Sequence, residues 1–336
     1  MNSEETANRT GGFYCNFRIR LIWPLLLFLL LTTTSCSFSR LQKDLNKHDT
    51  LVTISGAITS QSATSSPIII YMLTSDPLQP RLINYEVLKR PGHFSFAANP
   101  GTYCIYVYED SNRDQQHQDN ERTGSSGQIT ATEPGDQITG LTVVLPQQVN
   151  PALLREIHSI KRKSKTDLAN YKLHTGKIFA LDAPCFNKEF VTMGLWEPLK
   201  FIGKVPFGIL FMETYDPDKI PVLFIHGING SPRFFKEIIA NLDRNRFQPW
   251  LAYYPSGVKI EAIANYLLNL LNELDVRHDF KQLHIVAHSM GGLVSRSLIN
   301  LYNKEKDDFQ IDRMITISAP FAGHQAAAMG LNTLLQ

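Results

Sequence analysis

Residues 283–298 read LHIVAHSMGGLVSRSL, and this stretch decides the fold of the C-terminal half of the chain. It begins as an apolar run of strand character and continues with the apolar spacing of a helix. Ser289 stands between the two parts, with Ala287 two residues before it and Gly291 two residues after it. Small residues at these positions let a strand and a helix approach closely around a sharp turn that exposes the serine hydroxyl. We therefore predict Ser289 to be a candidate nucleophile, and the alternative is an ordinary serine N-cap.

The segments around this unit alternate between strand and helix patterns. The expected strands are 208–213, 221–227, 247–255, 281–288 and 312–320, and the expected helices are 232–242, 259–274 and 291–303. Ser231 and Pro232 are expected to be the N-cap and the first-turn residue of the first of these helices. Such alternation is typical of parallel βαβ units. The sequence thus predicts an α/β fold over residues 177–336.

A second motif, HGING at residues 226–230, ends the expected strand 221–227. A glycine-rich loop after a central strand can aim backbone N–H groups at a developing oxyanion. The stretches VLFIHGINGSP, YYPSG and VAHSMGGLVSR resemble α/β-hydrolase lipases and carboxylesterases over roughly residues 195–336. This resemblance implies Ser289 as the nucleophile and the N–H groups of Ile228 and Met290 as the oxyanion hole. It also implies a lipid or other carboxylic ester as substrate and no required cofactor.

The acid and the base of the triad are not evident. In this family both follow the nucleophile on later strands. After Ser289 the only histidine is His324, and the acidic residues lie in a helix-to-strand connector at the other end of the sheet: Glu305, Asp307, Asp308 and Asp312. The resemblance gives His226 a structural role, and the turn geometry points His288 away from the site. We expect the hydrolase domain to be C-terminally incomplete and Ser289 to be poorly activated.

Two functions follow from these observations. One is an envelope-anchored serine ester hydrolase. The other is a non-catalytic surface lipoprotein, a truncated hydrolase relic that acts as a binding module.

Residues 50–147 read as a small all-β domain. The expected strands are 51–58, 67–73, 81–88, 93–98, 102–110 and 140–146, separated by turn signals such as Asn-Pro-Gly at 99–101. In the fifth strand, Tyr103 and Val107 fall on one face and Tyr106 on the other. The pattern GHFSF…NPGTYCIYVYED resembles carboxypeptidase-regulatory or transthyretin-like sandwich modules. We expect Cys104 to be a core residue, because free cysteine packs as a small hydrophobe.

One loop of this β region has the spacing of a calcium site. Oxygen-bearing side chains stand at positions 1, 3, 5 and 12 of the loop: Asp110, Asn112, Asp114 and Glu121. Position 6 is Gln115 and not the glycine that a sharp turn favours. The alternatives are a weak structural calcium site and a solvated polar loop.

Residues 1–36 are predicted to be an export signal. The apolar run LIWPLLLFLLL at 21–31 follows Arg18 and Arg20 and precedes small residues that end at Cys36. This arrangement resembles the lipobox of bacterial lipoproteins, which implies lipidation of Cys36 and a membrane anchor. The resemblance places the protein in the cell envelope, with the outer membrane favoured by Ser37. The alternatives are an uncleaved anchor and an inner-membrane anchor facing outward.

Residues 148–176 are predicted to be a linker. It contains a short helical pattern at 151–160 and a basic run, KRKSK, at 161–165. A basic run of this kind contacts anionic lipid headgroups or forms a solvated face.

The composition excludes several classes of protein. The chain has 336 residues with 33 Lys and Arg against 31 Asp and Glu, a formal net charge of +2, so a nucleic-acid partner is not expected. Four cysteines in this length exclude a disulfide scaffold. With 43 % hydrophobic residues the chain can fill the cores of two domains.

Overall fold

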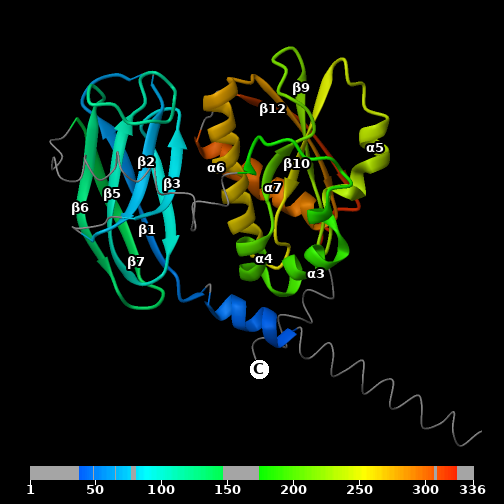
Figure 1. Cartoon of the computed structure of the whole chain (residues 1–336), viewed down its shortest axis with the longest axis horizontal. Coiled ribbons are helices and arrows are strands. Elements are labelled where there is room, and N and C mark those ends of the chain that lie inside the picture. The colour runs from blue at the N-terminus through cyan, green and yellow to red at the C-terminus, as the bar shows by residue number, and fades with distance from the viewer. Residues whose placement is uncertain are drawn as a thin grey trace, which may run out of the picture.

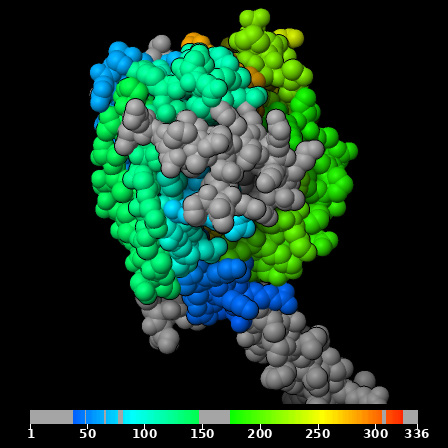
Figure 2. Space-filling view, turned by 60° about the vertical axis from the view of Figure 1, so that its left-hand side comes forward, coloured from blue at the N-terminus to red at the C-terminus, as the bar shows by residue number. Residues whose placement is uncertain are grey.

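A computed structural model of the chain describes residues 38–47, 49–64, 66–76, 81–146, 174–305 and 309–323. The predicted signal with Cys36 and the linker up to residue 173 lie outside the described residues, as does His324. Two units lie side by side in the described part, an N-terminal β domain and a C-terminal α/β domain (Figures 1 and 2). None of the described helices is both long enough and apolar enough to cross a bilayer.

The β domain consists of two sheets that enclose one core. Its strands are β1 (Val52–Ser60), β2 (Ile68–Thr74), β3 (Leu82–Leu88), β4 (His93–Ala98), β5 (Gly101–Glu109), β6 (Thr123–Ala131) and β7 (Gln137–Leu145). One sheet has the order β4-β1-β7 and the other β3-β2-β5-β6. Ile54 and Phe96 of the first sheet share a buried cluster with Ile70 and Ile105 of the second. This is the layered arrangement of a sandwich.

Strand β6 is absent from the sequence prediction. Its sequence, TGSSGQITA, has few apolar residues and lacks a regular alternation. It forms because β5, which is buried along most of its length, offers an edge to which β6 pairs in antiparallel fashion. The pairing partner and not the local pattern therefore determines this strand.

Both faces of β5 are buried. Tyr103, Ile105 and Val107 point into the sandwich core, so Tyr103 and Val107 share one face as predicted. Tyr106 and Tyr108 on the other face pack in a cluster with Val276 of the α/β domain. Cys104 lies 9 % exposed in this strand, and burial raises the pKa of its thiol.

The α/β domain is built on a five-stranded sheet of order β12-β11-β9-β10-β8. The strands are β8 (Gly208–Phe211), β9 (Ile220–Ile225), β10 (Phe247–Tyr253), β11 (Gln282–His288) and β12 (Gln310–Ile317). Strands β9 to β12 are mutually parallel, and β8 pairs antiparallel to β10 at the edge. The chain segments that follow β9, β10, β11 and β12 therefore gather at the carboxyl ends of these parallel strands. Open α/β sheets bind their ligands at this end.

Helices cover both faces of this sheet. Helices α6 (Ile260–His278) and α7 (Met290–Glu305) pack on one face. The other face carries η2 (Pro184–Phe186), α3 (Lys188–Trp196), α4 (Pro198–Lys204), η3 (Pro232–Phe235) and α5 (Lys236–Ala240). The helix predicted at 232–242 is thus a 3₁₀ turn followed by a short α-helix. Pro232 stands in its first turn as predicted, but the Ser231 side chain makes no capping hydrogen bond.

Polar contacts join the two domains along α6. Lys89 pairs with Asp275, whose side chain is 1 % exposed. Asn269 donates from its amide to the Glu86 carboxylate at 3.2 Å. Because the carboxylate of Asp275 is buried, its pairing with a lysine of the other domain fixes how the domains meet.

Candidate active site

Ser289 occupies the turn between β11 and α7. Its φ of 51° lies in the left-handed region, which a residue with a Cβ seldom adopts. Its N–H donates to the carbonyl of Ile317 at the end of β12, at 2.8 Å. Strained backbone of this kind persists where the surrounding structure enforces it, and it is common at functional sites. The half-buried serine thus stands at the edge of the sheet where the parallel strands end.

Three glycines allow this turn to pack. A Cβ on Gly291 would lie 2.3 Å from the Ile225 carbonyl oxygen, and one on Gly292 would lie 2.5 Å from the Ala319 Cβ. A Cβ on Gly227 would lie 2.9 Å from the Ser289 Cβ. The structure therefore brings the HGING loop directly against the serine. Met290 begins α7, so its N–H is among those that lack a partner within the helix.

The HGING loop is held in shape by a residue that follows the neighbouring strand β10. Asn229 has a φ of 49°, and its N–H donates to the Ser256 Oγ at 2.9 Å. Ile228 precedes it with a side chain that is 56 % exposed. Ser256 belongs to the YYPSG stretch, and the sequence analysis assigns it no role. Its part in shaping the loop depends on a contact across two strands, which no local pattern reveals.

His226 is a buried structural residue at the base of this loop. Its Nδ1 donates to the Gly227 carbonyl at 2.8 Å, and its ring stacks on Tyr254 with the ring centroids 4.1 Å apart. The hydroxyl of Tyr254 donates to the His226 carbonyl oxygen. Burial lowers the pKa of His226 to about 4, so the ring is neutral at pH 7. A ring so enclosed cannot turn toward Ser289, which agrees with its structural assignment.

Stability is expected to fall between pH 6.5 and pH 4 because of His226. Its pKa is lower in the folded protein than in the unfolded chain, so the unfolded chain takes up the proton first as the pH falls. The full shift corresponds to roughly 3 kcal/mol of unfolding free energy, lost as the pH approaches 4. Urea unfolding of the wild type and of His226→Asn at pH 7 and pH 4.5 measures this loss. An identical pH dependence in the two proteins would contradict the assignment.

As expected from the sequence, neither His288 nor Asp312 serves as the base or the acid of a triad in the described part of the chain. His288 stacks on Phe234 with centroids 3.8 Å apart. Asp312 lies near the start of β12, the end opposite to Ser289. Among the described residues the Ser289 hydroxyl has no hydrogen-bond partner. The candidate base His324 lies outside the described residues, so the activation of Ser289 stays a prediction.

The loop predicted to bind calcium is held by its own backbone. The buried carboxylate of Asp110 accepts N–H groups of Asp114 and Gln115, and the Glu121 carboxylate accepts those of Ser111 and Gln118. Gln115 reaches a φ of 56° without being glycine.

The predicted calcium ligands are Asp110, Asn112, Asp114 and Glu121. In the described part of the chain, no group of three or more acidic, His or Cys side chains is placed to hold a metal ion. The carboxylates of Asp110 and Glu121 instead stabilise the turn by accepting its N–H groups, which favours the polar-loop alternative. Calcium binding by this loop stays a prediction.

The parallel sheet, the strained serine turn and the glycine-rich loop together form the C-terminal α/β domain. Residues 251–333 match the family model described as a PGAP1-like alpha/beta domain. The match runs from within β10 through the Ser289 turn and past β12.

The chain is also similar to a solved structure over part of its length. The structure of the mature Bacillus licheniformis lipase BlEst2 is similar, with a TM-score of 0.30 and 23 % sequence identity. The alignment covers 35 % of this chain and 48 % of the lipase, so the chain spans about half the length of that protein. A search of the curated proteins finds no match.

Proposed function

We propose that the chain is a serine hydrolase of lipid or other carboxylic esters, with Ser289 as the nucleophile. The observation that carries this proposal is the left-handed φ of 51° at a serine that links a parallel strand to a helix. A sharp turn of this kind lifts the hydroxyl clear of the sheet and lies over the positive end of the helix.

In this proposal the N–H groups of Ile228 and Met290 stabilise the tetrahedral oxyanion. Two features support these two groups. Met290 is the first residue of α7, and the Ile228 loop is held in shape by the bond from Asn229 to Ser256. Donors that are fixed before the reaction stabilise a developing charge without reorganisation.

The non-catalytic alternative is also supported by one observation. Within the described residues the Ser289 hydroxyl has no partner that could take its proton. If no base reaches it, the domain would serve as a binding module. Lipidation of Cys36 and a place in the cell envelope are part of the proposal under either function.

A fluorophosphonate probe distinguishes the two functions. If Ser289 is the nucleophile of a working hydrolase, the probe labels the full chain on Ser289, because such probes react only with an activated serine. The label should disappear in Ser289→Ala and persist in Ser318→Ala, which removes a second serine of left-handed φ at the end of β12. Labelling of neither serine would favour the binding module.

A further inference from the structure

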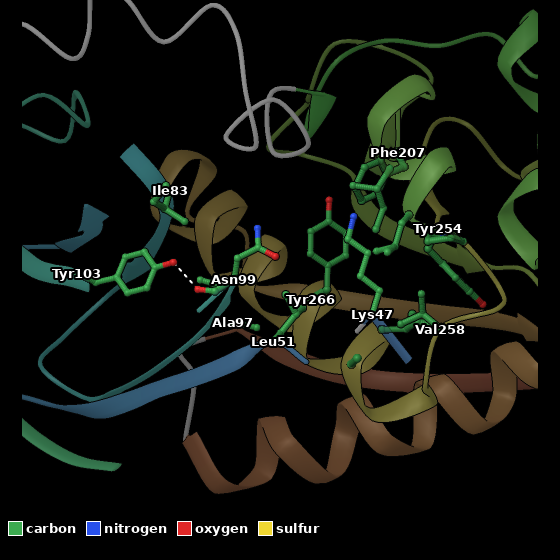
Figure 3. A pocket seen from close by; sticks show the side chains of 16 residues that line it. Lys47, Leu51, Ile83, Ala97, Asn99, Tyr103, Phe207, Tyr254, Val258 and Tyr266 are labelled. Carbon is green, nitrogen blue, oxygen red and sulfur yellow. Dashed lines mark hydrogen bonds between the residues drawn. The ribbon is translucent and has the colours of Figure 1, made fainter. Parts of the chain in front are cut away.

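A largely apolar cavity of about 430 Å³ lies between the two domains (Figure 3). Ile83, Ala97 and Tyr103 line it from the β domain, and Ile202, Phe207 and Tyr266 line it from the α/β domain. Its volume falls in the range of about 300–1,000 Å³ that is typical of small-molecule sites. Neither Ser289 nor any residue of the HGING loop lines it, so it is a second site.

Contacts around the cavity hold its walls in place. The Asp44 carboxylate accepts the N–H of Leu199 at the start of α4, at 3.0 Å. Lys259 pairs with Asp49 at 2.8 Å. The helical segment 38–47 is thereby fixed to the α/β domain just before the chain enters β1. These contacts hold one side of the cavity in place in the absence of a ligand.

The wall next to the candidate active site is closed. Tyr254 lines the cavity, but its hydroxyl points away from it and donates to the His226 carbonyl (Figure 3). The stacked rings of Tyr254 and His226 separate the cavity from the loop that carries Ile228. A ligand here would not reach Ser289 through this wall.

One cation lines the cavity. Among the described residues that line the cavity, Lys47 is the only charged one, and its side chain is exposed. An apolar enclosure excludes charged groups, whereas an exposed ammonium attracts an anion. The ligand that fits both features has an alkyl chain and one anionic end.

We propose that this cavity binds a single-chain fatty acid, with its alkyl chain between the domains and its carboxylate beside Lys47. Burial of the chain supplies most of the affinity. The exposed ion pair between the carboxylate and Lys47 adds little affinity and determines the orientation of the bound ligand.

Displacement of a dansyl-labelled undecanoic acid by dodecanoate tests the proposal on the full chain. Ala262 lies on the face of α6 that lines the cavity, whereas Asn265 of the same helix is exposed and lies outside it. We expect Ala262→Phe to fill the cavity and weaken binding by about tenfold or more, because several methylene groups lose their burial. The control Asn265→Phe adds the same ring to the surface of the helix and should bind like the wild type.

Two further variants complete the test. Ala97→Phe fills the cavity from the β domain and replaces Ala262→Phe if circular dichroism shows that variant to be unfolded. Lys47→Gln should weaken binding of dodecanoate by about two- to fivefold and leave binding of dodecanol unchanged. The measurement detects binding without turnover, so its outcome is independent of Ser289 chemistry.

Several outcomes would overturn the proposal. These are a wild-type chain that binds no probe, folded cavity-filling variants that bind as tightly as the wild type, or an equal loss in Asn265→Phe. If Lys47→Gln weakens dodecanoate and dodecanol alike, the proposed orientation of the carboxylate is wrong.

Discussion

Hydrolysis of a short p-nitrophenyl ester is expected to fall to the uncatalysed rate when Ser289 is replaced by alanine. The variant keeps the N–H groups of Ile228 and Met290 but has no oxygen that can form the acyl intermediate. Alanine keeps the Cβ of the serine and removes only its hydroxyl, which has no hydrogen-bond partner among the described residues, so the loss should be chemical. Initial rates at matched protein concentrations measure the effect, and circular dichroism confirms that the variant is folded.

The size of this decrease in hydrolysis rate indicates whether a general base reaches Ser289. A placed general base contributes about 10²- to 10⁴-fold to the rate. The sequence predicts weak turnover, since His324 is the only histidine after the serine. A large fall in both Ser289→Ala and His324→Ala would identify His324 as the base and contradict that prediction. A wild-type rate at background would instead favour the non-catalytic alternative.

The parts of the fold that the sequence predicts correctly are those with a strong local pattern. Strand β11 and helix α7 lie within a residue or two of their predicted bounds. Their apolar periodicities differ, and two glycines mark the point where one pattern replaces the other. The prediction of Ser289 in a sharp turn depends on the same local signal.

The features that the sequence did not predict depend on contacts between distant residues. Strand β6 forms through its pairing with β5, and the Ile228 loop is shaped by Ser256 of another strand end. The loop predicted to bind calcium has a related feature. The spacing of Asp110 and Glu121 in the sequence matches that of calcium ligands. It does not reveal that N–H groups of the loop donate to both carboxylates.

The cavity between the domains also has no local signature. Ala97 and Ala262 lie far apart in the sequence and line the same cavity because the two domains pack together, with β3 on α6. Neither residue stands out in a pattern, since alanine is common in both strands and helices. A site built from two domains becomes visible only when their relative position is known.

Gly291→Ala is expected to destabilise the α/β domain by about 3 kcal/mol, a large effect for one methyl group. The added Cβ would lie 2.3 Å from the Ile225 carbonyl oxygen and 2.6 Å from that of His226. Both are backbone atoms at the end of β9, so the start of α7 would have to move away from the sheet. The urea midpoint of unfolding, followed by circular dichroism at constant m-value, measures the loss.

The sign of the change in unfolding free energy distinguishes the effect of the close approach of α7 to β9 from that of helix propensity. Alanine is a better helix former than glycine by about 1 kcal/mol, so without the contact at Ile225 the variant would be more stable. Gly203→Ala provides the matched control, since a Cβ there meets nothing within 4 Å and should stabilise α4 by about 0.5–1 kcal/mol. An increase in stability in both variants would show that α7 does not approach β9 as closely as the structure has it. A loss in Gly291→Ala alone, with loss of the fluorophosphonate label, would show that the same contact that packs the helix also positions Ser289.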